Sequence, residues 1–438
     1  MSRTPAPSSP AAAAPLVLRR ARRAADRALC DIHLAEGRVT AVTPAAEPAA
    51  HPRADDAIDC AGRVVLPGFV EPHLHLDKAH LDKAHLDAVR PNPDGTLAGA
   101  ISVTAALKAG FTAEDVRARA SRVLEDAVLN GTTLVRAHPD VDPVVGLLGV
   151  EVLAELRERY AAAVDLQVVA FPQEGVLGTP GTEALLRAAL GKGADVVGGC
   201  TYQEETVADC RAQIRLVLDL AEEYGVPADL HADFGDDTED PRYALAGYVA
   251  EETARRGLGG RVTLGHMTSP AALPHAERLR LAEALAAAGV AVVSLPATDL
   301  HLGGRGDEER PVRRGVARVR ELWEAGVVTA CSSNNIRNAF TPYGSADPLD
   351  TALLLAQTGH LSGADDLARV LRMVTDDAAR VVGRADEYGV RAGARADLVV
   401  LDTTVPEDIV LDRPERAYVL KGGRVVARST RTRTLLVP

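Results

Sequence analysis

Val65-Leu-Pro-Gly-Phe-Val-Glu-Pro-His73-Leu-His75-Leu-Asp-Lys78 is a largely apolar run that ends in two histidines two residues apart. Side chains alternate between the two faces of a β-strand, so residues two apart share a face. The spacing therefore predicts that His73 and His75 point the same way. Two neutral imidazoles in this arrangement can occupy two positions around one metal ion.

The composition is typical of a globular protein with a large core. The chain has 438 residues, of which 47% are hydrophobic and 25% are charged. The net charge of -12 argues against nucleic acid as a partner. No apolar run approaches the length of a membrane span, so we expect no membrane partner. Five scattered cysteines without a C-x-x-C pair indicate a reduced, cytoplasmic protein.

The two chain ends have similar patterns. Residues 1–15 are rich in Ala, Pro and Ser and predict a disordered tail. Residues 16–66 form short apolar runs separated by turns that contain glycine, and residues 391–438 repeat this pattern. We expect these two segments to build one small β-sandwich beside a main domain over residues 67–390.

In the main domain, short apolar runs alternate with helical patterns. This alternation is typical of an α/β fold with a parallel sheet covered on both faces. Eight such runs predict a (β/α)8 TIM barrel, with an open doubly wound sheet as the alternative. The predicted strands are Arg63–Val70, Thr133–Ala137, Leu166–Phe171, Asp195–Gly199, Ala228–His231, Arg261–Gly265, Val290–Ser294 and Val327–Cys331.

Three of the intervening helices have clear signals. Thr112 is predicted to cap a helix that Gly131 ends. Long helices are also expected over Thr206–Tyr224 and Pro270–Ala288.

Active sites of such barrels lie at the carboxyl ends of the strands. His73, His75, His231 and His266 all fall at these ends. A single buried histidine is usually structural, but four at one face favour a metal or substrate site. Three nitrogen ligands leave room for a water molecule, and a bound metal lowers the pKa of that water towards neutrality. Lys78, just beyond the first strand, is predicted to contact the substrate.

Several motifs together resemble the bacterial cytosine deaminase branch of the amidohydrolase superfamily, over about residues 28–430. The motifs are Pro67-Gly-Phe-Val-Glu-Pro-His-Leu-His-Leu-Asp, Ala170-Phe-Pro-Gln-Glu-Gly, Gly193-Ala-Asp-Val-Val-Gly, His231-Ala-Asp, Gly265-His266 and His301-Leu-Gly-Gly-Arg-Gly-Asp.

The resemblance implies roles for particular residues. It implies that His73, His75 and His231 hold one divalent metal ion (Zn, Fe or Mn), as the matching histidines of the family do. It places His266 beside the hydrolytic water and Gln173 in hydrogen-bond contact with the ring of the substrate. Binuclear relatives carry a carboxylated lysine on the fourth strand. That region has no lysine here, so a mononuclear site is favoured.

Two positions depart from the family pattern. The family has His-x-Asp-Glu after the fifth strand, and its Glu shuttles protons, but this chain has Phe234 there. The family also ends the eighth strand in an Asp that binds metal and acts as a base, where this chain has Asn334. An amide cannot accept a proton from water at neutral pH. Since such proton transfer contributes roughly 10²–10⁴-fold to the rate, we expect poor cytosine deamination.

Three hypotheses follow. The first is a hydrolase that cleaves a C–N bond of a small cyclic amide, amidine or related N-heterocycle, with His266 and Asp233 as catalytic residues. The second is a non-hydrolytic enzyme (ring-opening, elimination or cyclisation) with weak or no metal binding. The third is an inactive ligand-binding homologue, against which the retained pocket residues argue. The expected substrate contacts are Gln173, Lys78, Phe234, His301 and Asn334. Oligomeric state stays open, and a homo-oligomer is compatible with the sequence.

Overall fold

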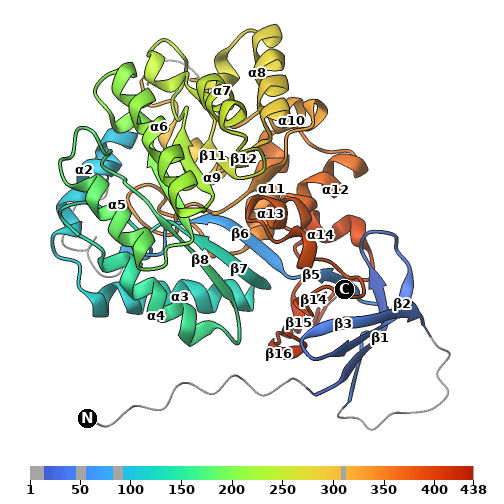
Figure 1. Ribbon diagram of the computed structural model, residues 1–438. Coiled ribbons are helices and arrows are strands. Elements are labelled where there is room, and N and C mark those ends of the chain that lie inside the picture. Colours follow the sequence, from blue (N-terminus) through green and yellow to red (C-terminus); the bar gives the residue numbers. More distant parts are fainter. Residues whose placement is uncertain (1–13, 46–55, 82–91, 307–311, 438) are drawn as a thin grey trace, which may run out of the picture.

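Eight parallel strands form a barrel at the centre of the molecule (Figure 1). The computed structural model describes residues 14–45, 56–81, 92–306 and 312–437. The barrel strands are β6 (Phe69–Leu74), β7 (Thr132–Ala137), β8 (Asp165–Ala170), β9 (Val196–Cys200), β10 (Ala228–Ala232), β11 (Val262–His266), β12 (Val290–Ser294) and β13 (Thr329–Cys331). Each strand pairs with the next in chain order. The predicted (β/α)8 barrel is confirmed.

Helices cover the outside of the barrel (Figure 1). They are α2 (Leu97–Lys108), α3 (Ala113–Leu129), α4 (Leu148–Tyr160), α5 (Thr182–Gly191), α6 (Val207–Tyr224), α7 (Ala246–Arg256), α8 (His275–Ala288), α9 (Pro296–Leu302), α10 (Val319–Ala325), α11 (Pro348–Thr358), α12 (Ala364–Arg372), α13 (Asp376–Val381) and α14 (Ile409–Asp412).

Capping residues set the helix starts. Thr112 accepts a hydrogen bond from a backbone N–H group in the first turn of α3, as predicted. Thr206 caps α6 in the same way, at the start of the predicted helix Thr206–Tyr224. The predicted helix Pro270–Ala288 was wrong at its start. A short 3-10 turn ends before Leu273, which is extended because it precedes Pro274, and α8 begins only after that proline.

Both chain ends build a second, smaller sheet beside the barrel (Figure 1). Its strands are β1 (Leu16–Arg23), β2 (Leu29–Ala35), β3 (Arg38–Pro44), β4 (Ala57–Asp59), β5 (Val64–Pro67), β14 (Leu398–Leu401), β15 (Arg416–Lys421) and β16 (Arg424–Ala427). The ends meet where β5 pairs antiparallel with β14. The predicted small β unit from both ends is confirmed. Its exact division from the main domain stays a prediction, and most of the predicted tail, residues 1–13, lies outside the described residues.

Gly68 corrects the first predicted strand. The run Arg63–Val70 is not one strand, because β5 belongs to the small sheet and β6 begins the barrel. At Gly68, between them, a Cβ atom would lie 2.2 Å from the side chain of Thr133. Only glycine therefore lets the chain pass this close as it moves from one sheet to the other.

The barrel closes between β6 and the residues that follow β13. The Asn334 N–H donates to the His73 carbonyl at 3.1 Å, and the His75 N–H donates to the Asn334 carbonyl at 2.8 Å. Glu71 is fully buried, and its carboxylate accepts hydrogen bonds from the Ser332 hydroxyl, the Ser333 hydroxyl and the Ser333 N–H. The carboxylate thus fastens the last strand to the first.

We expect Glu71→Leu to destabilise the barrel. The substitution leaves the buried Ser333 N–H without its acceptor, which costs about 1–3 kcal/mol of unfolding free energy. Ser333→Ala removes one hydroxyl and leaves the carboxylate two donors, so its loss should be smaller. Denaturant unfolding of both variants checks this order, and a Glu71→Leu protein as stable as the wild type would contradict the assignment.

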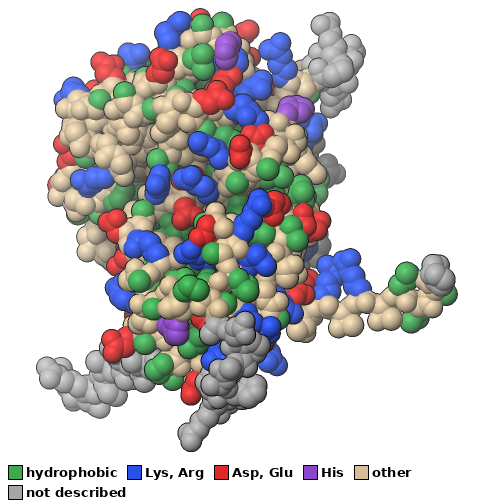
Figure 2. Space-filling model, turned by 90° about the vertical axis from the view of Figure 1, so that its right-hand side faces the viewer, with side chains coloured by type: hydrophobic (Ala, Val, Ile, Leu, Met, Phe, Trp, Pro, Cys, Tyr) green, Lys and Arg blue, Asp and Glu red, His purple; other side chains and the backbone are tan. Residues whose placement is uncertain are grey.

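The surface mixes charges of both signs. Figure 2 shows basic and acidic side chains interspersed on the face seen from the right-hand side of Figure 1. Several arginines of the small sheet pair locally, as Arg20 does with Asp59 and Arg23 with Asp26. Within the described ranges, no helix combines the length and apolar character needed to cross a membrane.

Candidate metal and catalytic site

Three histidine side chains converge inside the carboxyl end of the barrel. His73 lies on β6, His75 follows that strand, and His231 lies on β10. The His231 Nε2 atom is 2.9 Å from Nε2 of His73 and 3.2 Å from Nε2 of His75. All three side chains are buried. Burial, reinforced by neighbouring positive groups and histidines, holds the pKa of each well below its ordinary value, so the rings are neutral.

The hydrogen bonding of His75 fixes its tautomer. Its Nδ1 is 2.8 Å from the backbone carbonyl of His138, which can only accept, so Nδ1 carries the proton and Nε2 carries a lone pair. Nitrogens bound to one zinc ion at about 2.0–2.1 Å lie roughly 2.9–3.4 Å apart. The measured separations fall in this range for the two contacts of His231, so the three residues fit a single divalent ion.

A buried ionic group lies behind the three histidines. The Asp229 carboxylate is 3.0 Å from the Arg136 guanidinium, 3.4 Å from His138 Nε2 and 3.8 Å from His73 Nδ1. Burial works to raise the pKa of Asp229, but His138 and Arg136 outweigh it and lower that pKa. Asp229 therefore stays ionised near the outer nitrogen of His73, although 3.8 Å is too long for a direct hydrogen bond.

A histidine–aspartate pair, His266 and Asp299, lies next to the three converging histidines. His266, at the end of β11, has its Nδ1 2.7 Å from the Asp299 carboxylate, which comes from α9. The ring of Phe234 stacks on His266 with centroids 3.9 Å apart and planes inclined by 6°. The His266 ring centroid is 5.1 Å from that of His231. The Asp299 contact assigns the proton to Nδ1 and leaves Nε2 of His266 as a proton acceptor.

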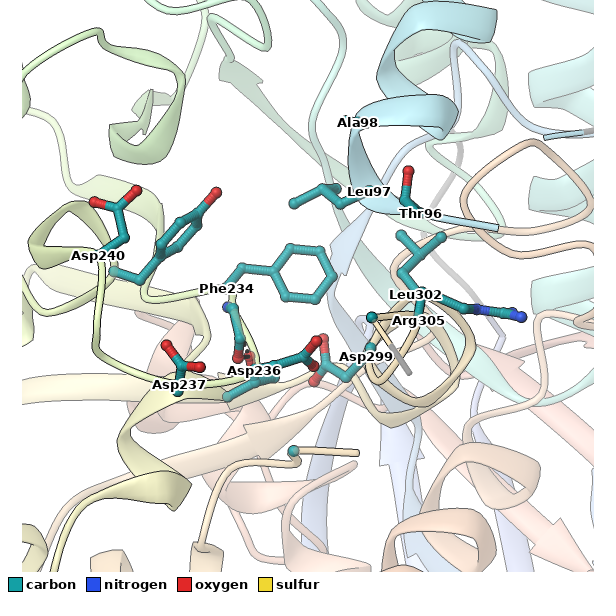
Figure 3. Close-up of a pocket in the computed structure, with 16 residues that line it drawn as sticks. Thr96, Leu97, Ala98, Phe234, Asp236, Asp237, Asp240, Asp299, Leu302 and Arg305 are labelled. Atoms are coloured by element: carbon teal, nitrogen blue, oxygen red, sulfur yellow. Dashed lines mark hydrogen bonds between the residues drawn. The ribbon is translucent and has the colours of Figure 1, made fainter. Parts of the chain in front are cut away.

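A cavity of about 360 Å³ opens beside Phe234 and Asp299 (Figure 3). Figure 3 shows the ring of Phe234 facing the side chains of Leu97 of α2 and Leu302 of α9, with which it forms one hydrophobic cluster. The wall is apolar on this side, and the rim carries the charged side chains of Asp236 and Arg305. The volume suits a small molecule.

Comparison with known proteins identifies the family. Residues 56–427 match the sequence profile of the Amidohydrolase family. The chain belongs to this family. It is 32% identical to a pterin deaminase of Rhizobium rhizogenes, with 91% of this chain and 88% of that protein covered. It is 31% identical to an N-isopropylammelide isopropyl amidohydrolase of Pseudomonas sp., with 85% of this chain and 88% of that protein covered.

Solved structures agree with this placement. A 5-methylcytosine deaminase from Klebsiella pneumoniae, liganded with phosphonocytosine, superposes with a TM-score of 0.89 at 33% identity. The alignment covers 97% of this chain and 100% of that one. The expectation of a carbon–nitrogen hydrolase resembling the cytosine deaminases is confirmed at the level of the family.

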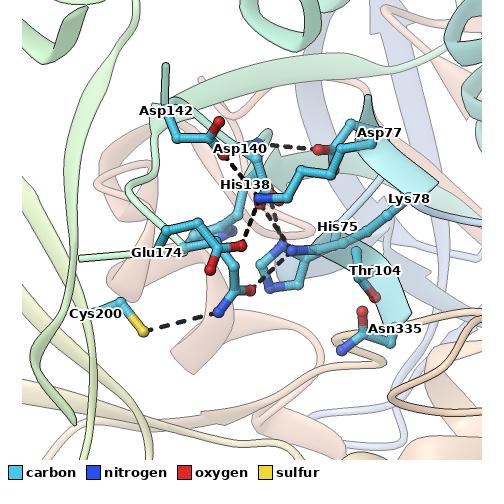
Figure 4. Close-up of polar contacts among 12 residues, drawn as sticks. His75, Asp77, Lys78, Thr104, His138, Asp140, Asp142, Glu174, Cys200 and Asn335 are labelled. Carbon is cyan, nitrogen blue, oxygen red and sulfur yellow. Dashed lines mark hydrogen bonds and ion pairs between the residues drawn. The ribbon is translucent and has the colours of Figure 1, made fainter. Parts of the chain in front are cut away.

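Lys78 and Gln173, two predicted site residues of this amidohydrolase, belong to the polar network shown in Figure 4. Lys78 is buried, and its Nζ lies 2.7 Å from Asp140 Oδ1 and 2.8 Å from Gln173 Oε1. Lys108, from α2, also contacts Asp140. The oxygens of Asp140 and Asp77 lie close enough to His75 for a second metal. The two ammonium groups already neutralise Asp140, so a cation is not needed there.

The backbone of Asn334 is hydrogen-bonded to the residues that carry two of the three converging histidines. Its N–H and carbonyl bond the main chain of His73 and His75, and its φ is 58°. The side chain is buried, and its Oδ1 has no hydrogen-bond partner within the described ranges. A buried acceptor without a donor is costly, so this oxygen is available to accept a hydrogen bond from water or a ligand, or to bind an ion.

Asp233 and His301 do not join the cluster. Both oxygens of Asp233 accept backbone N–H groups at the start of α7, from Leu245 at 2.8 Å and Ala246 at 3.0 Å. Burial raises the pKa of Asp233 to about 6 despite these bonds. His301 lies on α9 with its ring 5.7 Å from that of Tyr343. The residue of α9 that reaches His266 is Asp299 instead.

Asp229 and Asp299 lie beside the histidines of the site, and the sequence reasoning did not assign either of them. Asp229 carried a usable signal, because it lies two residues before His231 and so shares its strand face. Asp299 had only a weak signal, since its position on α9 depends on where the loop after β12 turns.

Proposed function

We propose that this amidohydrolase hydrolyses a C–N bond of a small N-heterocycle, using one divalent metal ion. The observation that carries the proposal is the convergence of three neutral Nε2 atoms beside the His266–Asp299 pair. His73, His75 and His231 would hold the ion, with the unpartnered Oδ1 of Asn334 as a further donor. A divalent ion bound there supplies Lewis acidity and lowers the pKa of a water molecule.

His266 is the proposed general base. Its Nδ1 donates to Asp299, so its Nε2 can take the proton that the water loses and return it to the leaving nitrogen. Asp299 stabilises the imidazolium that forms in between. The face of Phe234 lies against the same ring, and an aromatic face favours a cation by about 0.5–2 kcal/mol. Phe234 thus supports this relay, although it cannot carry a proton itself.

This relay differs from the one that the family pattern predicts. The proton pathway runs through His266 because Phe234 and Asn334 replace the two family carboxylates. Asp233, bound to the start of α7, acts as a positioning residue for the loop after β10 rather than as a base. We expect cytosine itself to be a poor substrate. The activities of the relatives, on N-isopropylammelide, pterin and 5-methylcytosine, support a heterocycle with an exocyclic nitrogen.

Metal analysis combined with a substrate panel tests this function. Protein expressed with Zn, Fe or Mn should contain about one divalent ion per chain and release ammonia or an alkylamine from at least one of these three heterocycles. Removing the ion with a chelator should abolish the release, and adding it back should restore the release. Protein that takes up none of the three metals would overturn metal-assisted hydrolysis and favour the non-hydrolytic alternative.

A further inference from the structure

We propose that Lys78 is a positioning residue that fixes the direction of the Gln173 amide, so that the site selects heterocycles that present a carbonyl oxygen. This inference rests on the proposed heterocycle site. It assigns to Lys78 a role in specificity rather than direct contact with the reacting atoms.

Hydrogen-bond chemistry sets the direction of the amide. The Lys78 ammonium has only donors, and its Nζ lies 2.8 Å from the side-chain oxygen of Gln173. The amide must therefore turn its oxygen towards Lys78 and its NH2 group away. One of the two N–H groups faces the Cys200 sulfur, with the nitrogen 3.9 Å from it, which is a weak contact. The other N–H finds no acceptor in the described part of the chain and is available to a ligand.

The amide lies beside the proposed metal ligands. Gln173 follows Phe171 by two residues, and the ring of Phe171 is 4.2 Å from that of His231, centroid to centroid. A ring bound at the histidines is thus within reach of the Gln173 amide.

Surrounding charges hold Lys78 in place (Figure 4). Its ammonium also lies 2.7 Å from Asp140 Oδ1, and Lys108 lies 2.9 Å from the other oxygen of the same carboxylate. Lys108 is in turn anchored by Asp142 and Glu174, each at 2.7 Å. The rings of Phe171 and Phe340 flank Lys78, with centroids 5.7 Å and 5.3 Å from Nζ. Flipping the amide would set its NH2 group against the buried ammonium, donor to donor.

The direction of the amide has a consequence for the substrate. An N–H donor pairs with a carbonyl oxygen or an unprotonated ring nitrogen and leaves an amino group unpaired. A site built around a buried donor rejects the mismatched analogue because its polar group stays unsatisfied. We therefore expect lactam-type rings to bind better than the matching rings in which an amino group replaces the carbonyl.

Two ligand pairs test the inference by equilibrium binding to the metal-loaded protein. The pairs are cytosine with 2,4-diaminopyrimidine and pterin with 2,4-diaminopteridine. In each pair the carbonyl is replaced by an amino group, and the neighbouring ring N–H becomes an unprotonated nitrogen. Calorimetry on the wild-type protein should show the carbonyl member of at least one pair binding roughly 10-fold tighter. Wild-type protein without a carbonyl preference in either pair would overturn the proposal.

Three variants separate Lys78 from the rest of the network. Lys78→Met frees the amide, so the preference should fall to within about 3-fold. Lys108→Met is the matched control, because it removes the other ammonium on Asp140 without touching Gln173, and the preference should persist. Gln173→Glu replaces the neutral amide with an anion beside Lys78 and presents only acceptors, so the preference should invert. Folded Lys78→Met protein with the wild-type preference would refute the inference, and if Lys78→Met does not fold, the inversion in Gln173→Glu decides.

Binding measurements test the role of Lys78, and turnover measurements test the proposed function, so the two proposals can fail independently. A protein that prefers carbonyl ligands but hydrolyses nothing would overturn the proposed function and keep the role of Lys78. A protein that hydrolyses a heterocycle, yet keeps its carbonyl preference in Lys78→Met, would support the proposed function and overturn the role of Lys78.

Discussion

Replacing His231 with alanine should abolish divalent metal binding and hydrolysis together. His231 is the centre of the group, because its Nε2 is the atom that lies close to Nε2 of both His73 and His75. Loss of a residue that only supports a metal ligand costs about 10–100-fold in affinity. Loss of this shared ligand should therefore cost more than roughly 100-fold. Elemental analysis and metal titration of the purified variant measure the effect.

His275→Ala is the control for this experiment. His275 lies on α8 with a side chain that is 67% exposed, so its removal deletes an imidazole without affecting the barrel interior. Its metal content should match the wild type. A His231→Ala protein that retains a full equivalent of metal would show that the ion is held elsewhere.

Asp299→Asn should lower kcat by roughly 10²–10⁴-fold while leaving metal content unchanged. The carboxylate at 2.7 Å from His266 Nδ1 holds the proton on that nitrogen and stabilises the imidazolium. An amide in its place can donate to Nδ1 and move the proton to Nε2, where the base is needed. Steady-state kinetics on the best heterocycle of the panel, with metal analysis of the same sample, check this expectation.

A second background shows whether Asp299 acts through His266. In His266→Gln protein, Asp299→Asn should cause little further loss, because residues that act as a unit are not additive. If the two losses multiply instead, Asp299 has a role that does not depend on His266, and the proposed relay is wrong.

Local chemistry determined much of this fold from the sequence. The alternation of apolar runs and helical patterns depends on neighbouring residues, so it predicted the barrel. The period of two along a strand predicted the shared direction of His73 and His75. Thr112 was identifiable as a cap because a cap contacts backbone only a few residues away. The predicted strand ends placed His231 and His266 at the same face of the barrel, and the family motifs added a role for each.

Only the tertiary structure decided the partners of the charged residues. Lys78, predicted to contact the substrate, is held by Asp140 and Gln173, which are 62 and 95 residues away in the chain. Asp233 binds the start of α7, and Asp299 rather than His301 reaches His266. The physical reason is the distance along the chain over which each interaction acts. Strand period and capping follow from backbone geometry over a few residues, whereas the direction of a buried side chain depends on which distant loop supplies its hydrogen-bond partner.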